Sequence, residues 1–209
     1  MLDRFRAFWT GLFQPVIAFL LKVGVSPDAV TLVGTLGVVV GALVFFPQGL
    51  LMTGVLVITA FVFSDLIDGA MARQSGRTSP FGAFLDSTLD RLGDAAIFAG
   101  LAMYYVGPGD SEPLAALAIY CLVMGSVTSY ARARAESLGM TAKVGIAERA
   151  DRLVAILVVT GVADLLHLLT DNEDWLWAIP VTLGALALAS TITVVQRILT
   201  VRDQANAAA

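Results

Sequence analysis

Charged residues are scarce in this sequence. They make up only 14% of the 209 residues, whereas soluble domains contain about 25%. Hydrophobic residues account for 57% of the chain, and the mean hydropathy is +0.82. This composition excludes an ordinary soluble domain and indicates a polytopic membrane protein.

Cysteine and histidine are almost missing. The single cysteine, Cys121, lies in an apolar run and has no partner for an internal disulfide. The single histidine, His167, lies far from the acidic stretch described below. A zinc site built from cysteine and histidine ligands is therefore not supported.

Long hydrophobic runs are what the sequence has instead. A transmembrane helix needs about 20 predominantly apolar residues, and the chain offers six such runs. They cover residues 27–47, 50–73, 81–106, 113–136, 148–168 and 175–200.

The first 22 residues follow a different pattern. Apolar side chains recur there at three- and four-residue steps, with Arg4, Arg6 and Lys22 at the ends, which is typical of an amphipathic helix in the membrane interface. We therefore predict an all-α polytopic membrane protein with one domain over residues 1–209. An interfacial helix over residues 1–22 precedes a six-helix bundle over residues 27–200.

The basic residues predict the orientation of this bundle. Apart from Arg91, which lies just inside span three, they lie before the first span, between spans two and three, around the connection of spans four and five, or near the end of span six. The other three connections carry only Asp110, Glu112, Asp171, Glu173 and Asp174. By the positive-inside rule, we expect a multi-pass protein of the cell membrane whose termini and active site face the cytoplasm.

Carboxylates gather in spans two and three. Asp65 and Asp68 are three residues apart, and Asp86 and Asp90 are four residues apart, so each pair shares one helix face. Because a short loop joins the two spans, we expect them to be antiparallel neighbours with the four acids at a similar depth. Carboxylates at membrane depth need protons or cations, and a purely oxygen ligand set suits Mg²⁺ or Mn²⁺.

Small residues and one arginine accompany these acids. Gly69 follows Asp68, and Gly82 lies one turn before Asp86, so there is room for a large ligand beside the backbone. Arg73 adds a fixed positive charge that suits a phosphate oxygen.

This stretch resembles the signature of the CDP-alcohol phosphotransferases, D-x2-D-G-x2-A-R-x8-G-x3-D-x3-D. Every fixed position is filled, by Asp65, Asp68, Gly69, Ala72, Arg73, Gly82, Asp86 and Asp90. The resemblance implies transfer of a substituted phosphate from a CDP-linked donor to an alcohol, with release of CMP. It also implies that Asp65, Asp68 and Asp86 hold two divalent ions, with Asp90 close to one of them and acting as general base. The donor, by the same resemblance, meets Asp28, Ala29, Val30, Thr31, Gly69, Arg73 and Ser79.

The donor and the acceptor are predicted on separate grounds. A site at the inner edge of the membrane suits a donor with lipid tails, hence CDP-diacylglycerol. A cluster of basic residues near the same edge favours an acceptor that carries its own phosphate. The cluster comprises Arg132, Arg134, Lys143, Arg149, Arg152 and Arg197.

The stretches SYARARAE and GIAERADRL resemble the actinobacterial phosphatidylinositol phosphate synthases. This second resemblance implies inositol phosphate as acceptor, with a relative using glycerol phosphate as the alternative. Membrane lipids are expected partners, nucleic acid is not, and the family's tendency to dimerise implies a homodimer. Gly37 and Gly41 form a G-x-x-x-G motif that could join helices within one chain or between two.

A cation or proton transporter is the alternative from another class, because intramembrane acids commonly mark ion paths. However, the acids cluster at one edge, and the other spans carry no acid near the middle of the membrane apart from Asp164, which lies towards the outer end of span five. A continuous path would need polar residues through the whole thickness, so the transferase is favoured.

Overall fold

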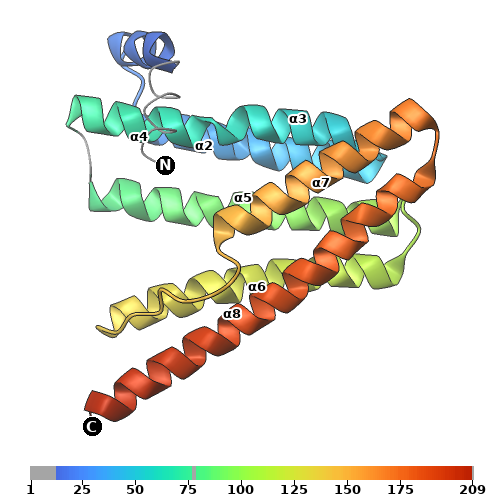
Figure 1. Cartoon of the computed structure of the whole chain (residues 1–209). Helices are drawn as coiled ribbons and strands as arrows, with labels where there is room; N and C mark the ends of the chain where they lie inside the picture. Colours follow the sequence, from blue (N-terminus) through green and yellow to red (C-terminus); the bar gives the residue numbers. More distant parts are fainter. Residues whose placement is uncertain (1–12, 77–78, 209) are drawn as a thin grey trace.

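The computed structural model describes residues 13–76 and 79–208, and these residues form an almost entirely helical chain (Figure 1). The helices are α2 (Pro27–Val40), α3 (Leu51–Val62), α4 (Ser64–Ser75), α5 (Pro80–Val106), α6 (Glu112–Ser137), α7 (Arg149–Thr170) and α8 (Ala178–Ala208). A π-helical turn, Gly41–Phe45, and a 3₁₀ turn, Phe46–Gln48, extend α2, and a 3₁₀ turn, Glu173–Trp177, leads into α8.

Two helices near the acidic stretch begin at Ser-Pro pairs. The Ser26 hydroxyl accepts a hydrogen bond from the Ala29 amide at 3.2 Å, and the Ser79 hydroxyl accepts one from the Gly82 amide at 2.9 Å. In both helices a proline follows the cap, where its missing N–H costs nothing. These caps fix the starts of α2 and α5 at the same end of the bundle (Figure 1).

The spans lie close to their predicted positions. Five stretches are long and apolar enough to cross a membrane: Pro27–Gln48, Leu51–Ser75, Glu112–Ser137, Arg149–Thr170 and Glu173–Ala207. Helix α5 is the remaining predicted span; it has 27 residues and runs alongside the others (Figure 1). It is less apolar because Asp86, Asp90, Arg91 and Asp94 lie along it.

The predicted single helix over residues 50–73 differs in one detail. It is interrupted at Phe63, which separates α3 from α4. The Leu66 amide there donates to the Phe63 carbonyl, a tighter turn than in an α-helix. The acids of this span therefore lie on their own short helix.

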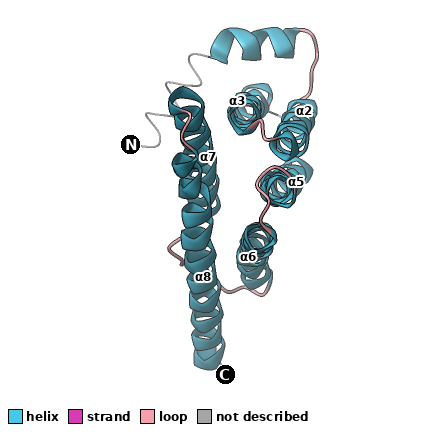
Figure 2. Ribbon diagram, turned by 90° about the vertical axis from the view of Figure 1, so that its right-hand side faces the viewer, coloured by secondary structure: helices cyan, strands magenta, loops and turns pink. Residues whose placement is uncertain are grey.

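The N-terminal segment is described only from residue 13, so the first half of the predicted interfacial helix lies outside the described residues. Residues Phe13–Lys22 form a helix that lies across the bundle axis (Figure 2). Ile17 is fully buried and packs with Ala70 and Met71 of α4. This part of the segment is thus attached to the helix that carries Asp68.

The helices form a ring in the order α3, α2, α5, α6, α8 and α7, and α7 closes it by packing on α3 (Figure 2). The sequence predicted that spans two and three are direct neighbours, but α2 packs against both α4 and α5 and these two do not pack closely on each other. The short loop would allow direct contact between α4 and α5, but the N-terminal half of α2 lies between them. The prediction of one domain over residues 1–209 is not tested by this arrangement.

The two ends of the bundle differ in what they carry. At one end, here the site end, lie the end of α4, the start of α5, the loop 138–148 and the end of α8 (Figure 1). At the other, the far end, lie the connections after α2, α5 and α7.

Candidate active site

Two of the predicted acids line a common cavity, here the aspartate cavity. It has a volume of about 240 Å³ and lies at the site end between α2, α4 and α5. The lining residues are Pro27, Asp28, Thr31, Asp68, Gly69, Ala72, Ser79, Gly82, Ala83 and Asp86. Acids from α4 and α5 thus meet here across the N-terminal turn of α2.

Asp68 is the most deeply placed of these acids. Its residue is only 7% exposed, and its Oδ2 atom makes no hydrogen bond within the described part of the chain. A buried carboxylate oxygen without a partner is costly, and a bound cation would compensate it. The residues present therefore fit a divalent metal.

The full metal-ligand set is not visible. The side chain of Asp65 lies outside the described part, although the residue belongs to α4, one turn before Asp68. Among the residues that the structure does describe, no three acids, histidines or cysteines are grouped closely enough to hold a metal. Asp86 lines the aspartate cavity with Asp68, whereas Asp90 lies one turn further along α5 in the neighbouring cavity.

The two glycines provide the predicted space. A β-carbon at Gly82 would lie 3.3 Å from the Ser79 hydroxyl and 3.5 Å from an Asp28 carboxylate oxygen. A β-carbon at Gly69 would lie 3.4 Å from the Arg73 guanidinium, so Arg73 extends over Gly69 at the edge of the cavity. Glycine at these positions leaves the backbone open to a ligand.

Two residues predicted for the donor lie elsewhere. Ala29 and Val30 do not line the aspartate cavity. Val30 packs against the cluster around Ile17 instead, because a helix turns its neighbouring side chains to different faces. Asp28, Thr31, Gly69 and Ser79 do line the cavity.

Asp90 is held in an ion-pair network. Arg149, at the start of α7, places Nη2 2.9 Å from Asp90 Oδ1 and Nε 2.9 Å from Asp94 Oδ1. Its Nε also contacts the other oxygen of Asp94 at 3.1 Å. One guanidinium therefore connects two carboxylates on successive turns of α5 through charge-assisted hydrogen bonds.

A second cavity, here the arginine cavity, has a volume of about 390 Å³ and opens beside this network. It is lined by Arg91, Thr128, Ser129, Arg132, Ala133, Glu136, Glu148, Arg149, Ala150, Arg152 and Arg197. Five arginines and only two glutamates line it, so its charge favours an anion.

Two of these arginines are also structural. Arg152 and Arg197 are each 3% exposed. Arg152 donates to the carbonyls of Ala147 and Gly125, and Arg197 donates to those of Val144 and Thr128. Both therefore connect the loop 138–148 to α6, and both still present charge to the cavity.

The remaining predicted basic residues have other positions. Arg132 lines the cavity but pairs with Glu136 at 3.1 Å. Arg134 and Lys143 do not line it, and Arg134 interacts with Ser137 of its own helix. Of the six predicted basic residues, the structure thus brings together Arg132, Arg149, Arg152 and Arg197.

The sequence reasoning gave no role to Arg91 and Asp94. Arg91 lines the arginine cavity, bonds to Ser129 and lies 3.4 Å from Asp94. The signal was available, because both follow Asp90 on a helix that is otherwise apolar towards its end. Polar residues at such depth usually have a functional role.

Comparison with known proteins places these observations in a family context. Residues 24–195 match the CDP-alcohol phosphatidyltransferase family. The phosphatidylinositol phosphate synthase of Streptomyces avermitilis is 52% identical, covering 98% of this chain and 84% of the relative. That of Cutibacterium acnes is 51% identical, covering 97% and 98%.

Solved structures agree with these relationships. The phosphatidylinositol phosphate synthase of Mycobacterium tuberculosis with CDP-DAG bound is similar with a TM-score of 0.82 and 43% identity, covering 90% of this chain and 92% of that one. A structure of the same protein with manganese and citrate gives a TM-score of 0.81 and 42% identity, covering 90% and 87%.

Proposed function

Since this chain belongs to the CDP-alcohol phosphatidyltransferase family, we propose that it transfers the phosphatidyl group of CDP-diacylglycerol to inositol phosphate. The products are phosphatidylinositol phosphate and CMP. The observation that carries the choice of acceptor is the adjacency of two unlike cavities, because Arg149 lines the arginine cavity and is also paired with Asp90.

The donor binds in the aspartate cavity. Asp28 and Thr31 of α2, Gly69 of α4 and Ser79 before α5 present polar atoms and open backbone there, which suits a nucleotide diphosphate. Arg73 lies at the edge and suits a phosphate oxygen. The tails of the lipid extend from this cavity along the apolar helix surfaces.

Asp65, Asp68, Asp86 and Asp90 hold two Mg²⁺ or Mn²⁺ ions. When bound, such ions clamp the pyrophosphate and neutralise the charge that develops on it. The orphaned Asp68 oxygen supports this role, as does the manganese in the related solved structure.

Asp90 is the general base. A carboxylate accepts the proton of the attacking hydroxyl once that oxygen is in line with the phosphorus. Arg149 and Asp94 fix the position of Asp90, since the guanidinium bridges the two carboxylates. The arginine cavity holds the phosphate of the acceptor beside this base, so that its free hydroxyl approaches Asp90. No covalent enzyme intermediate is needed.

The protein lies in the cell membrane with its termini and the site end towards the cytoplasm, where the acceptor is soluble. It acts as a homodimer. The G-x-x-x-G motif does not form the dimer contact, because a β-carbon at Gly37 would collide with Phe61 and one at Gly41 would lie 2.9 Å from Ile58, both in α3.

A direct comparison of acceptors tests this function. Purified protein with Mg²⁺ and CDP-diacylglycerol is supplied in parallel with inositol phosphate, glycerol phosphate, free inositol and serine. We expect CMP release with inositol phosphate and little with the two acceptors that lack a phosphate. Release with glycerol phosphate alone would show that the arginine cavity recognises a different phosphate ester.

A further inference from the structure

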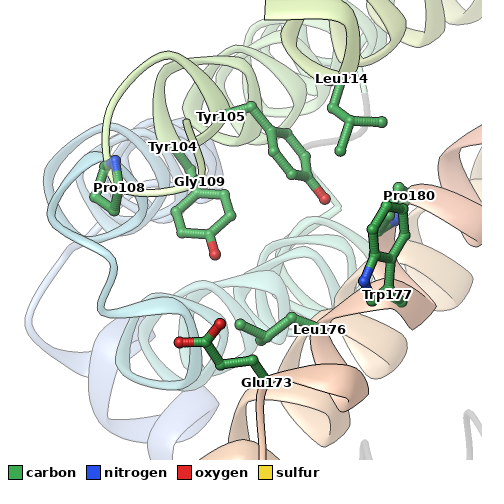
Figure 3. A pocket seen from close by; sticks show the side chains of 9 residues that line it. All are labelled: Tyr104, Tyr105, Pro108, Gly109, Leu114, Glu173, Leu176, Trp177 and Pro180. Carbon is green, nitrogen blue, oxygen red and sulfur yellow. The ribbon is translucent and has the colours of Figure 1, made fainter. Parts of the chain in front are cut away.

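A further cavity, shown in Figure 3, is lined by residues of the far end and shares none of its lining residues with the two substrate cavities. It has a volume of about 270 Å³ and lies between the end of α5, the connection that follows it and the start of α8. The lining residues are Tyr104, Tyr105, Pro108, Gly109, Leu114, Glu173, Leu176, Trp177 and Pro180. The transfer reaction gives none of them a role.

Tyr105 is the unusual residue of this cavity. It is only 4% exposed, yet its hydroxyl makes no hydrogen bond within residues 13–76 and 79–208. Buried polar groups normally have a partner, and leaving one unpaired costs stability. In Figure 3 the Tyr104 hydroxyl and the Glu173 carboxylate face one another on one side of the cavity, and the Tyr105 hydroxyl points into it on the side of Trp177 and Pro180.

The surroundings favour a positive charge. The three far-end connections carry Asp110, Glu112, Asp171, Glu173 and Asp174 and no lysine or arginine. Glu173 is the carboxylate that lines the cavity. Trp177, 66% exposed at the rim, and the two tyrosines add aromatic rings, which attract cations.

The number and type of oxygen atoms in the cavity favour one kind of cation over others. A divalent metal prefers six or more oxygen ligands with several carboxylates, and this cavity offers one carboxylate and two phenols. A quaternary ammonium has no N–H to donate to a phenol oxygen. A primary ammonium has three N–H groups, which match the two phenol oxygens and the Glu173 carboxylate.

We propose that the far-end cavity binds the primary ammonium group of a small amine. The ammonium donates to Tyr104, Tyr105 and Glu173, and a short methylene chain lies against Leu114 and Leu176. An aminoalkyl lipid headgroup and a soluble amine share this chemistry. The site is separate from the transfer reaction, so it does not depend on the proposed acceptor.

Thermal unfolding of the full chain tests the proposal in two settings. In detergent, ethylammonium is compared with tetramethylammonium at equal ionic strength. In bilayer nanodiscs, phosphatidylethanolamine is compared with phosphatidylcholine. We expect the primary amine to raise the unfolding temperature in at least one setting, together with a change in the tryptophan fluorescence of the chain, to which Trp177 at the cavity rim contributes. Stabilisation by ethylammonium identifies a soluble amine, and stabilisation by the lipid alone identifies a headgroup.

Two variants and two matched controls make the test specific. Tyr105→Phe and Glu173→Gln should raise the amine concentration needed for half of the stabilisation by about tenfold or more. Tyr130→Phe and Asp174→Asn remove the same groups from exposed positions outside the cavity and should change nothing. Without amine, Tyr105→Phe should unfold no earlier than the original chain, because it removes an unpartnered hydroxyl.

The proposal is overturned if neither primary amine stabilises the protein. It is equally overturned if the quaternary and primary forms act alike, or if both cavity variants respond as the controls do. CMP release, measured alongside, reports on the transfer site and is expected to be unaffected by the far-end variants.

Discussion

Asp90 and Arg149 illustrate how much of the chemistry depends on single side chains. Arg149 lines the arginine cavity and pairs with Asp90 at 2.9 Å, so the proposed base lies where the acceptor phosphate is held. The spacing of the aspartates predicted that each pair shares one helix face, and the structure brings Asp68 and Asp86 to one cavity while Asp90 lies in the neighbouring one. The contact between Arg149 and Asp90 could not be predicted, because it depends on where α7 begins relative to α5.

Asp90→Asn should lower the rate of CMP release by about a hundredfold to ten-thousandfold, the usual contribution of a general base. The amide keeps the size of the side chain but cannot accept the proton. The initial rate at saturating inositol phosphate is the measurement. The variant should keep its unfolding temperature within a few degrees, and near-normal turnover would contradict the assigned role.

Asp94→Asn should act through Arg149, which it holds by two contacts at 2.9 and 3.1 Å. Asparagine keeps one acceptor oxygen but replaces the other by an NH2 group and carries no charge. The Arg149 guanidinium is therefore held less firmly in its position beside the acceptor. We expect the KM for inositol phosphate to rise by about tenfold, in the range of a lost charged hydrogen bond, while binding of CDP-diacylglycerol is unchanged.

The control for Asp94→Asn is Asp203→Asn, because Asp203 is exposed and, within the part of the chain that the structure describes, forms an ion pair only with its neighbour Arg202. It should leave both parameters as they are. An increase in the apparent affinity for the acceptor in Asp94→Asn would show that Arg149 is instead withheld from the phosphate by Asp94.

At the scale of helices, the sequence did not predict that α2 lies between α4 and α5. The approximate positions of the spans followed from the apolar runs, which are local signals, although the predicted span 50–73 is divided into two helices. The neighbours of each helix follow from side-chain packing across the ring, for example Gly100 of α5 against the Ala42 carbonyl next to α2. The loop 138–148 likewise takes its position from buried contacts with Thr193 and Arg197, which no local pattern predicts.

Gly100→Ala should therefore destabilise the bundle. A β-carbon at this position would lie 2.5 Å from the Ala42 carbonyl oxygen, a backbone atom that cannot turn aside. We expect a loss of about 1–3 kcal/mol, the usual cost of overpacking, seen as a lower unfolding temperature in detergent. Gly184→Ala, with no neighbouring atom within 4 Å, is the matched control and should be neutral.

Over the whole molecule, the distribution of charge separates the two ends of the bundle. The site end carries both substrate cavities and the arginines, whereas the connections of the far end carry acids only. The positive-inside rule then predicts that the site end faces the cytoplasm. The connection after α5 lies at the far end of the bundle and the end of α8 lies at the site end. The two should therefore face opposite sides of the membrane.

This orientation can be tested by labelling introduced cysteines, because the single native cysteine does not have to be replaced first. Cys121 is 2% exposed, so a membrane-impermeant maleimide should leave it unlabelled. Glu112→Cys, at the exposed start of α6, should be labelled in intact cells, and Asn206→Cys, exposed near the end of α8, only after permeabilisation. The reverse pattern would place the substrate cavities outside, away from the soluble acceptor, and would contradict the proposed orientation. Labelling of both positions in intact cells would mean that the chain does not hold a single orientation.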